Sequence, residues 1–221
     1  RIVGESSQIA MPEAGIGLVP DVGGSLMLAL SPGHLGEYLG TTATRMGPTD
    51  AIYAGFADGF IPQADWAGIK ERLFAGDLGA ILYQTAPEGV LRGLQADIDR
   101  HFAGDTLGDV ERSLMAEESE FATRTLKALA RNAPLAMGCS MQIVRRLRSA
   151  DSIRRALEQE YRYTYRAVAQ GDFIEGIRAA IIDKDRSPKW AHPSIAALPD
   201  MDVSKMLMPL GEAGLTWKDM P

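Results

Sequence analysis

The sequence predicts an α/β fold at the front of the chain and a mostly α-helical region behind it. Up to about Pro62, short apolar runs are separated by glycine and proline, whereas longer amphipathic segments with recognisable helix caps begin near Asp109. Of the 221 residues, 46% are hydrophobic and 24% are charged, which is ordinary for a globular protein. We expect a front part over residues 1–75, a helical part over 76–190 and an irregular tail over 191–221.

The front part is expected to begin with short elements joined by tight turns. Residues 1–11 predict a short strand that enters a loop. Residues 25–42 predict short helices that are broken at Pro32-Gly33, because proline and glycine both interrupt a helix.

Three further elements complete the front part. Thr49-Asp50 is typical of a helix N-cap, and the helix that it starts should stop at Gly55. Residues 58–62, with the sequence DGFIP, predict a brief strand, and residues 65–74 predict a helix. Strands and helices therefore alternate here, which is the α/β pattern.

The helical part is expected to hold several capped helices. Asp109 starts the first, in which apolar residues recur close to helical spacing as far as Leu129. Pro134 marks the start of the second, and Ser152 caps a long third helix. The D-F-I-E sequence that begins at Asp172 is a capping-box-like start for a fourth.

Charge and cysteine content exclude several classes of function. The net charge is −6, and the short basic run RRLR at 145–148 is interpreted as a solvated helix face, so we expect no nucleic-acid partner. The lone Cys139 excludes an internal disulfide, suits a reducing compartment and is interpreted as a small buried hydrophobe. No apolar run approaches the roughly 20 residues that span a bilayer, so we expect no membrane partner. The three histidines lack metal-ligand spacing, so no metal is expected.

The stretch MPEAGIGLVPDVGG, residues 11–24, is the strongest indication of a functional site. It places two carboxylates, Glu13 and Asp21, in a glycine- and proline-rich loop among apolar residues. Desolvation and the proximity of a second acid both raise the pKa of a carboxyl group, which prepares it as a general acid, base or nucleophile. An N-cap aspartate and a salt-bridged glutamate would be the structural alternative, and chemistry alone leaves both open.

Three stretches carry a resemblance to a known family: residues 11–24, residues 41–62 and the run GDFIEGIRAAIIDKDRSPKW at 171–190. In this order they resemble the crotonase (enoyl-CoA hydratase/isomerase) superfamily, and within it the 3-hydroxyisobutyryl-CoA hydrolase branch. Enoyl-CoA hydratases carry a similar first motif, usually with glycine where this chain has Asp21. They generally lack the IDKD-x-SPKW ending.

The resemblance implies a crotonase-like ββα spiral, of which this chain holds the second half, followed by a mostly α-helical C-terminal region. It also implies a preceding segment, absent here, with the oxyanion-hole amides and most of the pocket for the CoA arm. We expect the chain to require that segment. Without it, apolar surface should be exposed around Ile2, Val3, Ile9 and Met11, which favours a homo-oligomer.

The activity that the resemblance implies is hydrolysis of a short-chain acyl-CoA thioester, most specifically 3-hydroxyisobutyryl-CoA, to the free acid and CoA. Glu13 aligns with the family's catalytic glutamate, as nucleophile or as base for water, and Asp21 aligns with the branch's second acid. Gly23, at the start of a helix, and Lys184, as a charge for CoA phosphates, are further substrate-binding candidates. No cofactor is expected beyond the CoA of the substrate, and the location would be the bacterial cytoplasm or the mitochondrial matrix.

Two other functions stay open. An enoyl-CoA hydratase or isomerase would use Glu13 as an acid–base group, although Asp21 and the SPKW ending argue against it. An incomplete crotonase-like protein could instead be a binding or assembly module without catalysis. The chain alone is expected to be close to inactive, since losing one oxyanion donor costs about 10²–10³ in rate.

Overall fold

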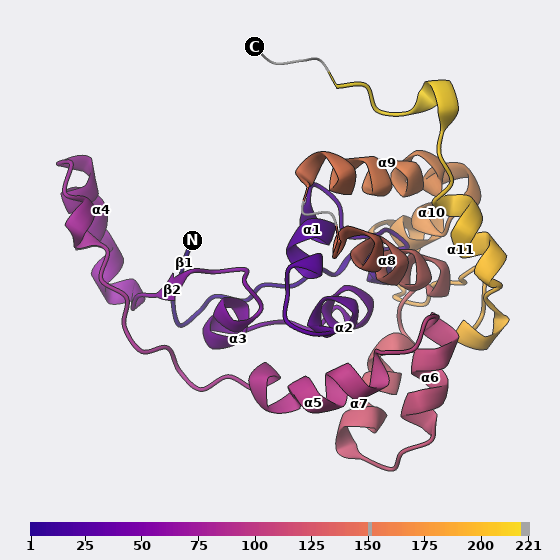
Figure 1. Ribbon diagram of the computed structural model, residues 1–221, viewed down its shortest axis with the longest axis horizontal. Coiled ribbons are helices and arrows are strands. Elements are labelled where there is room, and N and C mark those ends of the chain that lie inside the picture. Colours follow the sequence, from indigo (N-terminus) through magenta and orange to yellow (C-terminus); the bar gives the residue numbers. More distant parts are fainter. Residues whose placement is uncertain (150–151, 218–221) are drawn as a thin grey trace.

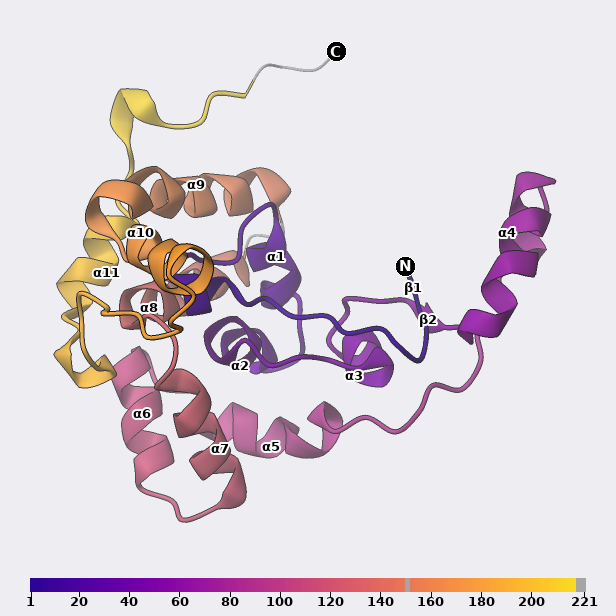
Figure 2. The ribbon, with the colours of Figure 1, turned by 180° about the vertical axis from the view of Figure 1, so that it is seen from behind.

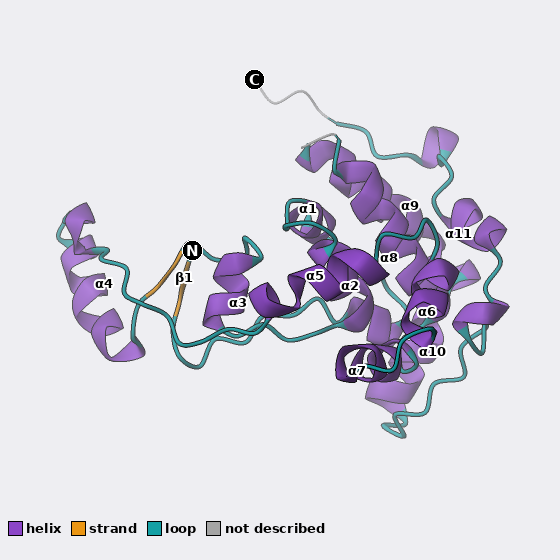
Figure 3. Ribbon diagram, turned by 60° about the horizontal axis from the view of Figure 1, so that its bottom comes forward, coloured by secondary structure: helices purple, strands orange, loops and turns teal. Residues whose placement is uncertain are grey.

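The computed structural model describes residues 1–149 and 152–217, and most of them lie in helices (Figures 1 and 3). Strand β1 (Ile2–Val3) pairs in parallel with β2 (Gly59–Phe60), with Ile2 opposite Gly59 and Val3 opposite Phe60. Parallel strands need a long crossover between them, and here it contains the acidic loop and three helices. The predicted order, α/β in front and helical behind, is confirmed.

Three short helices follow the acidic loop: α1 (Gly24–Ala29), α2 (Leu35–Thr42) and α3 (Pro48–Tyr53). The predicted break at Pro32-Gly33 separates α1 from α2. These two helices approach so closely that a Cβ on Gly36 would lie 2.0 Å from the carbonyl oxygen of Leu28. Glycine is therefore required at that position.

The remaining helices run from an outlying arm back to the main body (Figures 1 and 2). Helix α4 (Trp66–Phe74) projects away from the other helices beside the two strands, and the chain then returns through α5 (Leu91–His101). The later helices are as follows: α4 (Trp66–Phe74), α5 (Leu91–His101), α6 (Leu107–Met115), α7 (Glu120–Leu129), α8 (Pro134–Leu147), α9 (Ile153–Gln170), α10 (Phe173–Ile177) and α11 (Asp200–Met206).

The helix α8 lies at the centre of the core. It packs against α1, α2, α9 and α11, and its side chains are buried on nearly every side. Cys139 lies on it and is fully buried, as predicted, and burial raises the pKa of its thiol well above the ordinary range. One hydrophobic core contains buried residues from both the front helices and the later ones, from Val3 near the start of the chain to Leu207 near its end.

The prediction of a single helix from Asp109 to Leu129 is wrong. Two helices, α6 and α7, occupy this stretch, and each has its own cap. Thr106 and Asp109 form a reciprocal capping box, and the Ser119 hydroxyl accepts a hydrogen bond from the amide of Ala122. The periodic apolar residues misled the prediction because both helices turn their apolar faces toward the same core.

Two of the predicted caps have other roles. Helix α3 begins at Pro48 with Gly47 as its N-cap, and the Asp50 carboxylate accepts hydrogen bonds from the amides of Val90 and Leu91 at the start of α5, at 2.9 and 2.8 Å. Asp172 does precede α10, but its side chain accepts from the amide of Ala191 at 2.7 Å. Both carboxylates thus join segments that are distant in sequence.

The basic run at 145–148 is not a solvated face. The carboxylate of Glu37 on α2, which is fully buried, forms an ion pair with Arg148 and lies 3.5 Å from Nε of Arg145. Arg145 also donates to the carbonyl of Phe102 at 2.8 Å. This part of α8 therefore joins α2 to the end of α5.

The tail is not irregular throughout. Helix α11 packs on α8 and α9, and Val203 and Met206 are buried there. The carbonyls of Met206 and Met208 accept hydrogen bonds from Arg166 of α9 at 3.0 and 2.8 Å. Pro193, Pro199 and Pro209, which suggested an irregular tail, lie outside the helix, and Pro221 lies outside the described residues.

The exposed apolar surface agrees with the prediction only at Ile2, which is 36% exposed. Val3 is buried, and Ile9 and Met11 pack partly buried against the core. Large apolar side chains are instead exposed on α4 and the segment after it, where Phe74 is 90% and Leu78 is 79% exposed.

Candidate active site

The acidic loop folds into a short 3₁₀ helix and a tight turn. Glu13 begins the 3₁₀ helix (Glu13–Ile16), which ends at Gly17 with a φ of +74°. Further along the loop, the amide of Gly24 donates to the carbonyl of Asp21 at 2.8 Å and closes a turn that leads directly into α1. The two carboxylates therefore lie at the two ends of one compact loop.

Glu13 and Asp21 are both half-buried, and the surroundings of Glu13 perturb its pKa. Its Oε2 atom is buried and has no hydrogen-bond partner. Desolvation raises the pKa of Glu13, and the charge of Asp21 raises it further, although hydrogen bonding to the Glu13 amide acts in the opposite direction. The structure thus brings Glu13 and Asp21 close enough to interact, and it leaves one oxygen of Glu13 without a partner.

Neighbouring helices approach the 3₁₀ helix so closely that only glycine fits at two positions. A Cβ on Gly176 of α10 would lie 2.1 Å from the carbonyl oxygen of Ile16, and one on Gly17 would lie 2.6 Å from the backbone of Asp172. On another side the amide of Ala133, just before α8, donates to the carbonyl of Ala14 at 2.9 Å. The backbone around Glu13 is therefore fixed from more than one direction.

Glu160 and Tyr163 of α9 also contact the loop, and the role of both was missed in the sequence. The buried carboxylate of Glu160 accepts hydrogen bonds from the amides of Gly23 and Ser25, at 3.0 and 3.1 Å, and from the Ser25 hydroxyl. Tyr163 donates its buried hydroxyl to the carbonyl of Gly17 at 2.9 Å. A glutamate within a strongly amphipathic helix gives no local signal that it caps another helix 137 residues earlier.

The remaining predicted site residues have other surroundings. The Gly23 amide is engaged by Glu160, so it is not a free donor for a substrate oxygen. Lys184 is exposed, in the turn after α10, with a φ of +57°. These observations do not place Lys184 next to the acidic loop, and its role in binding CoA phosphates stays a prediction.

Arg178 organises the IDKD-x-SPKW stretch. Its guanidinium contacts the carboxylates of Glu175, Asp183 and Asp185 at 2.7 to 2.8 Å and donates to the carbonyl of Ser187 at 3.1 Å. Hydrogen bonding to Arg178 lowers the pKa of Glu175 to about 2. This motif therefore forms a charged turn, directly after the helix that packs on the acidic loop.

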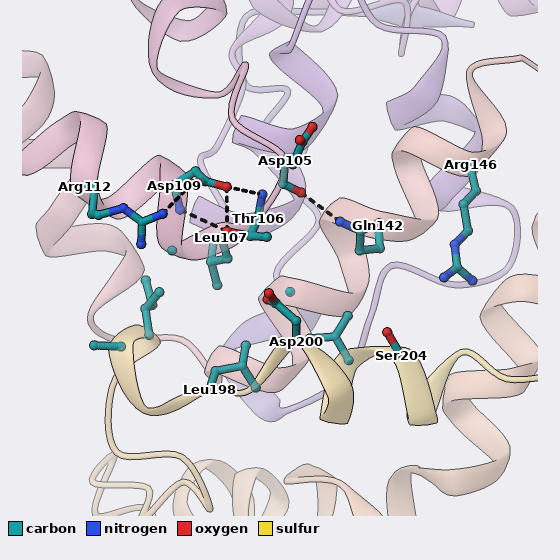
Figure 4. A pocket seen from close by; sticks show the side chains of 15 residues that line it. Asp105, Thr106, Leu107, Asp109, Arg112, Gln142, Arg146, Leu198, Asp200 and Ser204 are labelled. Atoms are coloured by element: carbon teal, nitrogen blue, oxygen red, sulfur yellow. Dashed lines mark hydrogen bonds and ion pairs between the residues drawn. The ribbon is translucent and has the colours of Figure 1, made fainter.

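A separate groove of about 620 Å³ lies between the start of α6, α8 and α11 (Figure 4). Asp105, Gln142 and Arg146 line it, and Gln142 donates to the carbonyl of Asp105 at 3.0 Å. Neither Glu13 nor Asp21 lines this groove, so its size does not mark the paired acids. Among residues 1–149 and 152–217, no group of three or more potential metal ligands comes together.

The sequence profile of the enoyl-CoA hydratase/isomerase family matches residues 1–207. The chain belongs to the enoyl-CoA hydratase/isomerase family. The resemblance to the crotonase superfamily is thereby confirmed. No helix within the described part of this family member is long and apolar enough to cross a membrane.

Two solved structures are similar to nearly the whole chain. An enoyl-CoA hydratase from Rhodobacter sphaeroides is 54% identical and matches with a TM-score of 0.94, over 98% of this chain and 64% of its own. A carnitinyl-CoA dehydratase from Mycobacterium thermoresistibile is 31% identical, with a TM-score of 0.91, over 100% of this chain and 64% of its own. The predicted crotonase-like fold is confirmed.

The chain is also similar to several curated proteins. The mitochondrial 3-hydroxyisobutyryl-CoA hydrolases of Homo sapiens and Dictyostelium discoideum are both 29% identical, over 97% and 95% of this chain. A small ribosomal subunit protein, mS47 of Arabidopsis thaliana, is 32% identical over 93% of this chain. The chain spans about three fifths of the length of the first two relatives, 59% and 58%.

Proposed function

We propose that this chain carries the catalytic carboxylates of an acyl-CoA thioester hydrolase that acts on 3-hydroxyisobutyryl-CoA. One observation carries the proposal: the partnerless, desolvated Oε2 of Glu13 beside Asp21, on a loop held by three helices. The relatives named 3-hydroxyisobutyryl-CoA hydrolases favour this substrate. So does Asp21, because enoyl-CoA hydratases usually have glycine there.

Glu13 supplies the reacting oxygen or activates it. In one route the ionised carboxylate attacks the thioester carbonyl and expels CoA as the thiolate, and water then hydrolyses the mixed anhydride. In the other route Glu13 takes a proton from water as the water attacks. In the second route a raised pKa favours proton uptake by Glu13, whereas the first route requires its ionised carboxylate. Single turnover in ¹⁸O-labelled water tests the first route, because attack of water on the Glu13 carbonyl carbon of the anhydride places the label in the Glu13 carboxylate, which the second route cannot do.

Asp21 binds the 3-hydroxyl group of the substrate or orients the attacking water. The donors that stabilise the charge on the carbonyl oxygen come from other residues, because Glu160 already occupies the amides of Gly23 and Ser25 at the start of α1. We expect no cofactor beyond CoA and no metal, so a chelator should leave the rate unchanged. We propose that the protein works in a reducing compartment, either the bacterial cytoplasm or the mitochondrial matrix.

The decisive experiment measures products with the protein as its host produces it. Wild-type protein should release CoA thiol from 3-hydroxyisobutyryl-CoA faster than from isobutyryl-CoA. Glu13→Gln should lower kcat by about 10²–10⁴, because the amide can neither attack nor accept a proton. Asp21→Asn should reduce the preference for the hydroxylated ester. Wild-type rates in both variants would refute the catalytic assignment.

The second candidate is an enoyl-CoA hydratase, and the 54% identity to the enoyl-CoA hydratase from Rhodobacter sphaeroides favours it. In that reaction water adds across the double bond of an enoyl-CoA, and the thioester survives. Incubation with crotonyl-CoA separates the two functions. Loss of the enoyl absorbance without release of thiol would identify a hydratase and overturn the hydrolase proposal.

The third candidate is a binding or assembly module without catalysis. The similarity to a ribosomal subunit protein favours it. This function predicts no turnover of either ester and no effect of Glu13→Gln on assembly. Turnover that depends on Glu13 would exclude it.

A further inference from the structure

The turn that carries Asp21 has a backbone conformation that needs support from outside. Its two central residues, Val22 and Gly23, have φ values of +55° and +87°. For a residue with a Cβ the left-handed region is strained, and a β-branched valine there is a true outlier. The Val22 side chain is 86% exposed, so its own packing does not hold the turn. Such strain persists only where the surroundings impose it, and it is concentrated at functional sites.

Glu160 imposes this conformation through the two oxygens of one carboxylate. Oε2 accepts the hydrogen bond from the Gly23 amide, and Oε1 accepts those from the amide and the hydroxyl of Ser25. Glu160 is only 2% exposed. Its charge faces donors at the start of α1, where a negative charge is favourable. Three charge-assisted hydrogen bonds therefore hold the residues directly after Val22.

Tyr163 holds the other end of the same segment. It lies one helical turn after Glu160 on α9, and its hydroxyl donates to the carbonyl of Gly17. Burial raises the pKa of Tyr163, so the hydroxyl keeps its proton. Helix α9 thus contacts the chain on both sides of Asp21, at Gly17 and at Gly23.

We propose that α9 positions the acidic loop, and that Glu160 is the residue that fixes the position of Asp21 relative to Glu13. This inference rests on the proposed function for its effect on turnover. Glu160 and Tyr163 act through the loop backbone and are positioning residues. A displacement of about 1 Å at a reacting group can cost about 10²-fold in rate, so even a slight opening of the turn should be measurable.

The required group is a carboxylate, because both of its oxygens face donors. In Glu160→Gln the amide oxygen can still accept from one side, but the NH₂ group must face either the Gly23 amide or the Ser25 donors. Two donors then oppose each other in a buried site, which is costly. The shape of the side chain is unchanged, so the variant tests this contact with little change in packing.

Glu158→Gln is the matched control. Glu158 lies on α9 two residues before Glu160, and its carboxylate accepts from the indole nitrogen of Trp217 at 2.9 Å, at the surface. In the protein as its host produces it, Glu160→Gln should lower kcat by about 10- to 100-fold. The Kd of a CoA thioether, which cannot be hydrolysed, should change by less than about threefold, because substrate binding is not lost. Glu158→Gln should keep the wild-type values of both.

Tyr163→Phe is the second variant, in case Glu160→Gln does not fold. It keeps the ring and removes only the hydrogen bond to Gly17. A smaller fall in kcat, again with an unchanged Kd, is expected. A wild-type kcat in folded Glu160→Gln would overturn the proposal. So would a parallel loss of kcat and affinity, because that pattern indicates only a general structural role.

Amide hydrogen exchange of the peptide that spans residues 11–25 provides a readout without activity. Exchange should be faster in Glu160→Gln than in Glu158→Gln, and equal exchange would overturn the positioning role. If the wild-type protein hydrolyses no thioester, the proposed function fails while this measurement still decides whether α9 holds the loop.

Discussion

At the scale of single residues, the environment of Glu13 that prepares it for catalysis also lowers the stability of the fold. A carboxyl group whose pKa is raised by folding binds its proton more tightly in the folded state than in the unfolded state. The free energy of unfolding therefore falls as the pH rises from the ordinary glutamate range through the raised pKa. The ionised form of Glu13 therefore destabilises the folded state.

Glu13→Gln should consequently be more stable than the wild type at pH 7 to 8. The glutamine is always neutral, and each unit of pKa shift corresponds to about 1.4 kcal/mol. The difference should vanish at about pH 3, where the wild-type carboxyl is protonated in both states. Urea unfolding at a series of pH values measures this. A variant that is less stable than the wild type at pH 8 would contradict it.

Val22 gives a second prediction at this scale. Asparagine adopts the left-handed region more readily than valine, and the exposed Val22 side chain loses no buried packing when it is replaced. Val22→Asn should therefore stabilise the fold by about 1 kcal/mol. Thermal unfolding checks this, with Val168→Asn as a control at an exposed position within α9. An equal change in both variants would show that the added polar group, and not the relief of backbone strain, is responsible.

At the scale of elements, the caps define which segments are joined. Thr106 and Ser119 cap two separate helices, although their common apolar periodicity predicted a single one. Asp50 lies on α3, but its carboxylate caps the start of α5. The connection between Asp50 and the start of α5 attaches the returning chain to the front helices. It is a buried contact between elements about 40 residues apart.

Asp50→Ala should lower the free energy of unfolding by about 1–2 kcal/mol, because the amides of Val90 and Leu91 lose their acceptor. Asp97→Ala is the matched control. Asp97 lies within α5 and forms only an exposed ion pair with Arg100, for which about 0–1 kcal/mol is expected. Urea denaturation of both variants gives the comparison. Equal losses would mean that Asp50 does not cap α5.

At the scale of the whole molecule, the arm formed by α4 and the segment after it is the feature that affects assembly. Phe74, Leu78 and Leu82 are between 69% and 90% exposed, and an apolar groove beside them is lined by Ile2, Ile61, Trp66, Ile69 and Leu73. Exposed apolar surface of this kind is covered by another protein surface in most folded proteins.

Material that contains only these 221 residues should therefore self-associate. Replacing Phe74 and Leu78 together by serine should shift the distribution toward monomer, whereas Val168→Ser on the distant helix α9 should not. Light scattering on mass-verified samples measures the effect. A stable wild-type monomer would refute the homo-oligomer that the sequence suggests.

Local pattern was enough to predict much of this fold. The break at Pro32-Gly33, the starts of α8 and α9 and the buried Cys139 depend on neighbours within one or two helical turns, and each agrees with the structure. The paired acids were also evident, because glycine, proline and two carboxylates lie within 14 residues of one another. The division into three parts stays a prediction, and one continuous core crosses its boundaries.

The sequence by itself determined the family, the order of short mixed elements before long helices, and the loop that bears Glu13 and Asp21. Only the tertiary structure decided how that loop is held, where the apolar surface lies and which acids act as caps. The physical reason is distance along the chain. Glu160 meets Gly23 across 137 residues, and Asp50 meets Leu91 across 41. No local propensity encodes a hydrogen bond whose partner is supplied by the packing of a remote helix.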